Sequence, residues 1–459
     1  MNKVVIPEHV KLILDKLKEC GYEGYVVGGC VRDSLRGVTP KDWDITTNAT
    51  PDEMKEVFKE YKLLPIGERY GTMTVLLNEE SYEVTTFRAD GEYSDGRRPD
   101  AVKFAENIED DLSRRDFTVN AMAYSETAGL IDPYGGYVDL KARIIRCVGN
   151  AEDRFNEDAL RIMRAVRFAV TMDFDISKDT VHAVWECGHN LCNVSAERKT
   201  AELVKILTSV NKLNRQSEHY QKLCRMVEYL IKRIIPEFQD LAQVTHNNPY
   251  HYTDIFTHTM EMLFADSADI EIQLTILFHD IGKIKARVFD EKRLTNHYYK
   301  HPVYSAEMTK EILTRMRFDS RAIDSVVKLI EVHDVILKPD RRCAKRLLNK
   351  LGHEQCLQLA RFQELDKQAH RWNTSAEYED WRQGVKSLRE MWTDIVQNQE
   401  AFKVSDLAIN GDDLIALGYG QGRAIGRMLN KCLDYVIEYP NKNTKPELLK
   451  YVKSKMFLL

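Results

Sequence analysis

The sequence predicts an α+β protein in which a small head with a mixed sheet is followed by a long helical region. Three stretches of apolar and β-branched residues, at 25–27, 71–77 and 82–88, have the composition of strands. Beyond residue 150, apolar residues recur at intervals of three and four, which is the period of a helix with one buried face. These observations place the sheet in the first third of the chain and helices in the rest.

Length and composition are those of a soluble protein with several domains. The chain has 459 residues, more than one hydrophobic core accommodates, and it is 43% hydrophobic and 30% charged. We expect a head over 1–150, a helical neck over 151–240, a third domain over 241–370 and a helical tail over 371–459. The net charge of −5 does not by itself indicate a nucleic-acid partner, although a local basic patch is compatible with one.

The sequence also indicates a cytoplasmic protein that does not enter a membrane. No apolar run is long enough to span a bilayer, and the N-terminal segment carries charges where a signal peptide would be apolar. The nine cysteines form no CxxC pair, which favours reduced thiols over a disulfide framework or a zinc ribbon.

Two glycines after the first predicted strand indicate a phosphate-binding turn. Gly28 and Gly29 follow the apolar run 25–27, and because they lack side chains they allow backbone N–H groups to approach a phosphate. Arg32 follows closely, and its planar guanidinium can hold the same phosphate.

Two aspartates come next and predict a metal site. Asp42 and Asp44 are two residues apart, so on a strand both carboxylates would point to one face. Two carboxylates beside a phosphate-binding turn suit the Mg²⁺ ions that assist phosphoryl or nucleotidyl transfer. Glu83 could add a third carboxylate, and a solvated strand residue is an equally good interpretation of it. A plain glycine turn followed by solvated aspartates is the alternative for the whole set, but the order GG, RD and DxD favours nucleotidyl transfer.

A charged helix over 157–168 carries the second informative pattern. At 100° per residue, Arg161, Arg164 and Arg167 share one arc, with Asp158 on the same side, while apolar residues occupy the opposite arc. This could be an exposed face with an Asp158–Arg161 ion pair. It could instead read a base: the carboxylate would accept from an exocyclic amino group, and the arginine would donate to the adjacent ring nitrogen. Such an edge would select CTP and ATP over GTP and UTP, because a mismatched base leaves the buried groups unpaired.

These motifs together resemble a known family. The set GGxVRD, DxD, RRDFTxNAMA and EDxxRxxRxxRF is similar to that of the class II tRNA nucleotidyltransferases, the bacterial CCA-adding enzymes of the polymerase-β-like superfamily. The resemblance implies that Asp42 and Asp44 bind Mg²⁺ and activate the 3′-hydroxyl of tRNA. It implies that the nucleotide is held by Gly28, Gly29, Arg32 and Arg115 at the triphosphate and by Asp158, Arg161, Arg164 and Arg167 at the base.

The activity implied by the resemblance is addition of CCA to the 3′ end of tRNA from CTP and ATP, without a template and with release of pyrophosphate. Two relatives of the same fold stay open: an enzyme that adds only the final A, and a bacterial poly(A) polymerase. The segment 67–72 lacks the basic run of poly(A) polymerases, and the loop 89–111 has the length expected of enzymes that add A. An alternative of another class is a phosphohydrolase with an RNA-binding head.

The third predicted domain resembles the HD phosphohydrolase superfamily. The motif HDIGK at 279–283 follows an apolar helix, and further histidines and an aspartate come in the order of that superfamily. The resemblance implies a metal site made of His258, His279, Asp280 and Asp366, which His301 and His333 would extend to a second metal or a phosphate. Imidazole and carboxylate ligands suit a transition metal that activates water. The tail resembles the tRNA-binding tail of the same bacterial enzymes.

Overall fold

A computed structural model describes residues 4–89, 103–244, 254–265, 269–291, 295–369 and 376–456. The chain divides into two compact units, Met1–Pro236 and Glu237–Leu459. The boundary between the units lies close to the expected limit at residue 240. The finer division into four domains stays a prediction.

A mixed sheet of seven strands forms the centre of the first unit, in the order β3-β4-β5-β2-β1-β8-β9. Strands β2 and β5 pair in parallel, and all other neighbours are antiparallel. The predicted mixed-sheet head is therefore confirmed. The strands are β1 (Gly24–Val27), β2 (Ile45–Thr47), β3 (Lys62–Leu64), β4 (Thr72–Leu77), β5 (Glu80–Thr86), β8 (Ala123–Ser125) and β9 (Gly129–Ile131).

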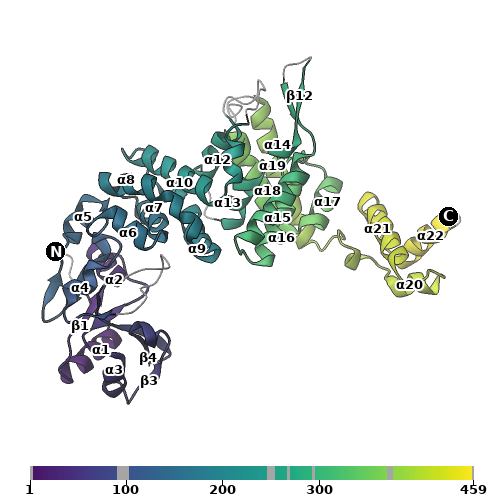
Figure 1. Ribbon diagram of the computed structural model, residues 1–459. Helices are drawn as coiled ribbons and strands as arrows, with labels where there is room; N and C mark the ends of the chain where they lie inside the picture. Colours follow the sequence, from purple (N-terminus) through teal and green to yellow (C-terminus); the bar gives the residue numbers. More distant parts are fainter. Residues whose placement is uncertain are drawn as a thin grey trace. The chain divides into compact units, whose positions relative to one another are not determined.

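Local sequence explains the first helices of the head (Figure 1). Helix α1 (Glu8–Glu19) buries Val10, Ile13 and Leu17 on one face. Helix α3 (Pro51–Val57) begins with a capping box between Thr50 and Glu53. The remaining short elements of the head are α2 (Gly29–Arg36), η1 (Glu68–Tyr70), β6 (Arg88–Ala89), β7 (Lys103–Phe104), α4 (Ile108–Ser113), η2 (Thr118–Asn120), α5 (Gly136–Ala142) and β10 (Ile144–Ile145).

Helices follow the head within the same unit, as predicted, with one exception. The short strand β11 (Asp175–Ile176) pairs in parallel with β10, so this region is not purely helical. The helices are α6 (Ala151–Glu157), α7 (Leu160–Met172), α8 (Lys178–Cys187), η3 (Gly188–Asn193), α9 (Ala196–Leu207), η4 (Val210–Lys212) and α10 (Tyr220–Ile234).

Where the structure describes the second unit, its regular elements are helices except for one hairpin of strands β12 (Arg287–Asp290) and β13 (Thr295–Tyr298). This hairpin also departs from the all-helical expectation. Its helices before the tail are α11 (Glu237–Leu241), α12 (Ile255–Leu263), α13 (Ile270–Phe278), α14 (Lys283–Ala286), α15 (His301–Arg315), α16 (Ser320–Val332), α17 (Arg341–Leu351), α18 (His353–Ala369) and α19 (Ala376–Gln397).

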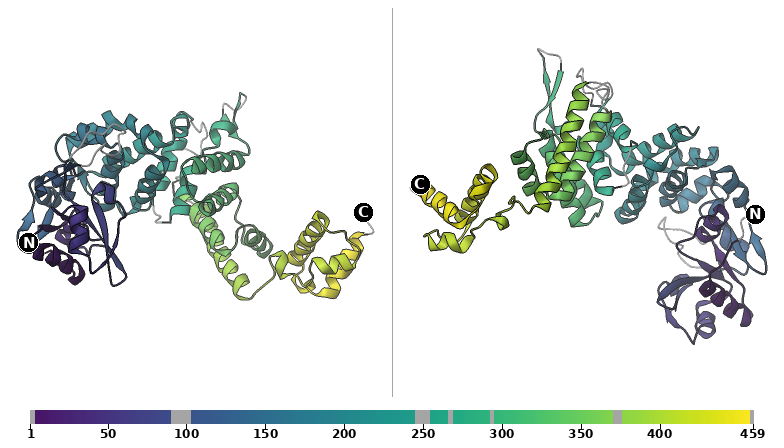
Figure 2. Two further views of the ribbon diagram at one scale, coloured as in Figure 1. Left: turned by 60° about the horizontal axis from the view of Figure 1, so that its bottom comes forward. Right: turned by 180° about the vertical axis from the view of Figure 1, so that it is seen from behind.

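The C-terminal helices share a hydrophobic core of their own. Leu414, Leu433 and Leu448 lie in this core, one from each of three helices. The yellow helices of Figure 2 show this grouping. The elements are η6 (Val404–Asp406), α20 (Gly411–Ala416), α21 (Arg423–Glu438), η7 (Pro440–Lys442) and α22 (Lys445–Met456).

Candidate functional site

The parallel pairing of β2 and β5 brings two predicted carboxylates side by side. Ile45 pairs with Val84 and Thr46 with Thr85. Asp44 and Glu83 each come just before the first of these pairs, Ile45–Val84, and are therefore neighbours where the pairing of the two strands begins.

Asp44 and Glu83 line one pocket of about 210 Å³ together with three arginines. The remaining wall of the pocket comes from Val27, Ile45 and Thr85, and the arginines are Arg88, Arg114 and Arg115. Desolvation raises the pKa of the Asp44 carboxyl, Arg115 opposes this shift, and the charge of Asp42 adds to it. A pocket lined by both carboxylates and arginines has oxygen ligands for a cation and positive charge for a polyphosphate.

Asp42 is placed differently from the expectation. Strand β2 begins only at Ile45, so Asp42 and Asp44 precede the strand and are not fixed on one of its faces. Asp42 and Asp44 are both exposed, but only Asp44 is among the residues that line the pocket. Within the described part of the chain, Asp42, Asp44 and Glu83 do not form a group whose oxygens lie within 4.8 Å of one another.

The predicted glycine turn lies against an arginine. Gly28 has φ +78°, which favours glycine, and a Cβ built on it would lie 2.9 Å from Nη1 of Arg115. Helix α2 begins at Gly29, so the free N–H groups of its first turn start at this point. The Nε of Arg115 is buried and has no acceptor among the residues that the structure describes. This unpartnered donor fits a phosphate oxygen.

A buried aspartate holds the arginines of the pocket. Asp111 accepts from Arg114 Nη2 at 2.5 Å and from Arg115 Nη2 at 3.0 Å. Burial alone would raise the pKa of Asp111, but Arg115 and Arg114 lower it, so the carboxyl stays ionised. Sequence reasoning missed Arg114 and Asp111. The charged residues before the apolar run at 117–123 were the available signal.

Arg32 forms hydrogen bonds within the protein that the prediction of a phosphate-binding residue did not include. Its Nε and Nη2 donate to the two carboxylate oxygens of Asp33, each at 2.9 Å, and its Nη1 donates to Asn120 Oδ1 at 2.6 Å. One edge of the guanidinium is therefore occupied by Asp33. A phosphate would use the remaining N–H groups.

Asp158 does not lie on the predicted helix. Helix α6 ends at Glu157 and α7 begins at Leu160, so Asp158 lies in the break between them, with φ −146° and ψ 101°. Its carboxylate accepts from Leu160 N at 3.0 Å and from Arg198 at 3.2 and 2.6 Å. The exposed-face alternative had Asp158 paired with Arg161, but in the structure Asp158 pairs with Arg198.

The three arginines of α7 do share one side of the helix, but they are paired rather than solvated. Arg161 Nη1 donates to Glu157 at 2.6 Å, and Arg167 contacts Glu202. Arg164 pairs with Asp116 at 2.6 Å, and this carboxyl has a lowered pKa, since Arg164 and Asn120 outweigh the effect of burial. Asp116 and Asn120 were also missed as contributors to this region.

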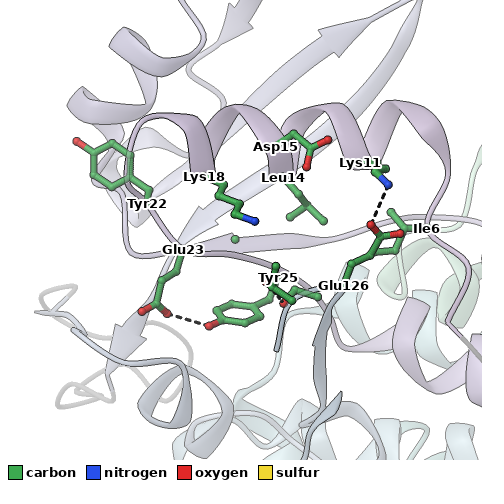
Figure 3. Close-up of a pocket in the computed structure, with 12 residues that line it drawn as sticks. Ile6, Lys11, Leu14, Asp15, Lys18, Tyr22, Glu23, Tyr25 and Glu126 are labelled. Atoms are coloured by element: carbon green, nitrogen blue, oxygen red, sulfur yellow. Dashed lines mark hydrogen bonds and ion pairs between the residues drawn. The ribbon is translucent and has the colours of Figure 1, made fainter. Parts of the chain in front are cut away.

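A second pocket of the head lies at the other end of strand β1 and contains no predicted site residue. Its volume is about 280 Å³ (Figure 3). Lys11 pairs with Glu126 at 2.8 Å, and the Tyr25 hydroxyl donates to Glu23 at 3.0 Å. Because these charges pair within the wall, the pocket is less suited to a triphosphate than the first one.

The second unit gathers the predicted histidines and aspartates into two adjoining groups. In each group the three ligand atoms lie within 4.8 Å of one another. The groups are His258, His279 and Asp366, and Asp280, His301 and His333. Asp280 joins them, since its Oδ2 lies 3.2 Å from His279 Nε2 and its Oδ1 lies 3.4 Å from His301 Nε2.

Main-chain carbonyls orient three of the imidazoles. The Nδ1 atoms of His279, His301 and His333 lie 2.8, 3.1 and 2.7 Å from carbonyl oxygens one helical turn or loop earlier. A proton on each Nδ1 leaves Nε2 with a lone pair directed into the cluster. The Nε2 atoms of His301 and His333 are 3.2 Å apart, a separation at which two lone pairs repel unless a cation or proton lies between them.

Burial keeps one of these histidines neutral. Burial and the neighbouring His279 lower the pKa of His333 to about 3. A neutral imidazole beside an ionised carboxylate is the donor set of a transition-metal site. This cluster therefore fits a metal ion better than Asp42 and Asp44 do.

Three family models match the chain. The poly A polymerase head domain matches residues 24–146, which contain the pocket with Asp44. A model described as a probable RNA and SrmB-binding site of polymerase A matches 173–214. The tRNA nucleotidyltransferase domain 2 matches 301–452. The fold and the site thus define a nucleotidyltransferase.

Individual similar proteins show which family of nucleotidyltransferases this is. The CCA-adding enzyme of Ligilactobacillus salivarius is 35% identical over 348 residues, which cover 66% of this chain and 86% of that enzyme. That of Oceanobacillus iheyensis is 45% identical over 228 residues, about half of each chain. The crystal structure of the Bacillus stearothermophilus CCA-adding enzyme in complex with CTP is 27% identical, with a TM-score of 0.70 over 98% of this chain and 97% of the other. The chain belongs to the family of CCA-adding enzymes.

In the part of the chain that the structure describes, no helix combines the length and the apolar character needed to cross a membrane.

Proposed function

We propose that this protein adds CCA to the 3′ end of tRNA from CTP and ATP, by attack of the terminal 3′-hydroxyl on the α-phosphate. The observation that carries the proposal is the pocket that Asp44 and Glu83 line together with three arginines. Two carboxylates and several guanidinium groups around one cavity are the charges that a metal-bound triphosphate requires.

Mg²⁺ would be held by Asp44, with Asp42 and Glu83 as further oxygen ligands. Hard oxygen ligands suit this ion, and it keeps part of its water shell, so a loose group of carboxylates can bind it together with substrate phosphates. When bound, such an ion would polarise the α-phosphate and lower the pKa of the attacking hydroxyl. The raised pKa of Asp44 in the free protein indicates a carboxyl that a nearby cation would stabilise.

The triphosphate would lie over the glycine turn. Gly28 and Gly29 present the N-terminus of α2, Arg115 lies directly above Gly28, and Arg32 has N–H groups left on the edge away from Asp33. The unpartnered Nε of Arg115 is the donor that this ligand would satisfy.

The base would be selected by Asp158 and the arginines of α7. Arg198 holds the Asp158 carboxylate in a fixed orientation, and a carboxylate oxygen has a second lone pair available for the exocyclic amino group of cytosine or adenine. Arg161 is bound to Glu157 and to two main-chain carbonyls. To read a ring nitrogen, it must use its remaining N–H groups or exchange one of these partners.

The test is incorporation of labelled CTP and ATP into a tRNA transcript that lacks CCA. Wild-type protein should extend it by three nucleotides. Asp44→Asn should reduce the rate by about 10³-fold or more, because metal assistance contributes several kcal/mol. Asp324→Asn, a substitution at an exposed position of α16 outside the pocket, is the control and should extend the transcript at the wild-type rate. Unreduced incorporation by Asp44→Asn would refute the assigned site.

A second activity is favoured by the histidine cluster of the second unit. We propose that it binds a transition metal and hydrolyses phosphoesters, because four imidazoles and two carboxylates converge in one largely buried cluster. Hydrolysis of a 2′,3′-cyclic mononucleotide in the presence of Mn²⁺ or Ni²⁺ is the assay. Loss of hydrolysis in folded His279→Ala and Asp280→Ala is expected, and hydrolysis unchanged by both substitutions would contradict the proposal.

A further inference from the structure

Four side chains of the first unit form a continuous chain of hydrogen bonds between the two ends of the proposed nucleotide site. Arg32 Nη1 donates to Asn120 Oδ1 at 2.6 Å, and Asn120 Nδ2 donates to Asp116 Oδ1 at 3.0 Å. Asp116 Oδ2 accepts from Arg164 Nε at 2.8 Å. Arg32 belongs to the triphosphate end and Arg164 to the base end, so the chain joins the two.

The two linking residues are placed rigidly. Asp116 is 8% exposed and Asn120 is 6% exposed. Asp116 Oδ1 also accepts from the main-chain N–H of Phe117 at 2.9 Å, which fixes the carboxylate. If Arg32 or Arg164 moves, Asn120 and Asp116 must therefore move with it, because these two buried side chains cannot turn toward solvent.

Phe168 supports the same connection. The guanidinium carbon of Arg32 lies 5.1 Å from the centre of its ring, that of Arg164 lies 5.3 Å away and that of Arg167 lies 3.9 Å away. Three cations on one ring repel each other and are attracted to the ring, so their positions depend on one another.

We propose that Asp116 and Asn120 are positioning residues that couple base recognition by Arg164 to triphosphate binding by Arg32; this inference rests on the proposed nucleotide site. A base that engages Arg164 correctly fixes Asp116, and Asn120 then holds Arg32 in the orientation that receives the phosphates. A base that displaces Arg164 disturbs the phosphate site as well. Selection of the base thus acts on the rate of transfer and not only on binding.

Inorganic tripolyphosphate separates the two ends of the site, because it has neither base nor sugar. Its dissociation constant is measured by calorimetry on full-length wild-type protein, Arg164→Lys, Asn120→Ala and the double variant. Each single variant should bind about tenfold more weakly, as expected for one charged hydrogen bond. The double variant should bind no more weakly than Asn120→Ala, since both substitutions break one chain.

Two results would overturn the coupling. Unchanged affinity of Arg164→Lys would show that the base end does not influence the phosphate end. Losses that multiply in the double variant would show that the two residues act independently. If Asn120→Ala does not fold, Asp116→Asn takes its place in the same cycle, because it keeps the shape of the side chain.

A kinetic readout distinguishes positioning from a purely structural role. Asn120→Ala should lower kcat/KM for CTP about tenfold while changing that for UTP little, so that selectivity falls, although Asn120 does not touch a base. Equal losses for both nucleotides would contradict the proposal. Asn150→Ala, which removes only the helix cap that accepts from Asp153 N, is the matched control and should keep both tripolyphosphate affinity and selectivity. CCA addition by the wild type is measured separately, so failure of the proposed function and failure of the coupling give different results.

Discussion

Asp158 and Arg198 form a two-point ion pair, with Nη1 to Oδ1 at 3.2 Å and Nη2 to Oδ2 at 2.6 Å. The pair joins the break between α6 and α7 to helix α9. Asp158 Oδ1 also accepts from Leu160 N, so under the proposed function Oδ2 is the oxygen with a lone pair left for an amino group.

Removal of Arg198 should therefore relax base selection even though Arg198 itself donates to no base. In Arg198→Ala, the ratio of kcat/KM for CTP over UTP should fall about tenfold, since one charged hydrogen bond of about 1.5–3 kcal/mol no longer orients Asp158. Asp158→Ala should relax selection against UTP and GTP at least as far. Steady-state incorporation with each nucleotide measures both, and unaltered ratios in both variants would exclude a base-reading role.

Gly28 should be required for nucleotide binding because Arg115 leaves no room for a side chain at this position. In Gly28→Ala, the new Cβ would lie 2.9 Å from Arg115 Nη1, and the backbone φ of +78° would be strained. We expect KM for CTP and ATP to rise together, about tenfold, with unchanged discrimination between bases. Gly129→Ala has a similar φ of +74° with nothing within 4 Å of the added carbon, so it controls for strain alone. Equal kinetics of the two variants would argue against a phosphate site above Gly28.

The histidine cluster should bind metal independently of the head. Metal-free protein titrated with Mn²⁺ or Ni²⁺ should show binding and a raised unfolding temperature, because a ligand of the folded state stabilises it. His301→Asn combined with His333→Asn should remove the binding supplied by the second group, and Asp44→Asn should leave the cluster's affinity unchanged. Affinity should fall as the pH is lowered, because imidazole must be neutral to bind a metal. An equal affinity of the histidine double variant would contradict the assignment.

Acid should destabilise the first unit through Asp116. Its folded pKa is lowered, so the Arg164 pair contributes stability above about pH 4, the ordinary range of an aspartate, and this contribution is lost as the pH falls through the folded pKa. Asp116→Asn should be about 2 kcal/mol less stable than wild type at pH 7, and the difference should shrink as the pH falls below 4. Urea unfolding of wild type and Asp116→Asn at pH 7 and below pH 4 measures the difference in free energy of unfolding. A difference that stays constant with pH would contradict the prediction.

The sequence predicted the sheet, the glycine turn and the partition of strands and helices well, because these features depend on local patterns. The segments 71–77 and 82–88 carry the apolar and β-branched residues of strands. Thr50 and Glu53 have the spacing of a capping box, which marks the start of a helix. The histidine cluster was predicted through the order of its residues, and the structure brings all six together.

Partners in space could not be predicted. Asp158 pairs with a residue 40 positions away, and the helix that seemed continuous over 157–168 is broken at that aspartate. No role was predicted for Asp111 and Asp116, and both are buried. Periodicity reports which face of a helix is apolar, not which distant charge meets the polar face. The assigned roles of the individual site residues remain predictions.

The central claim is tested most directly by incorporation of CTP and ATP on three RNAs: a tRNA ending before CCA, a tRNA ending after CC, and an unstructured RNA. We predict that C, C and A are added to the first, that only A is added to the second, and that the third receives almost nothing. Addition only to the second would indicate an A-adding enzyme, long tails on the third a poly(A) polymerase, and no incorporation on any RNA would contradict the nucleotidyltransferase site itself.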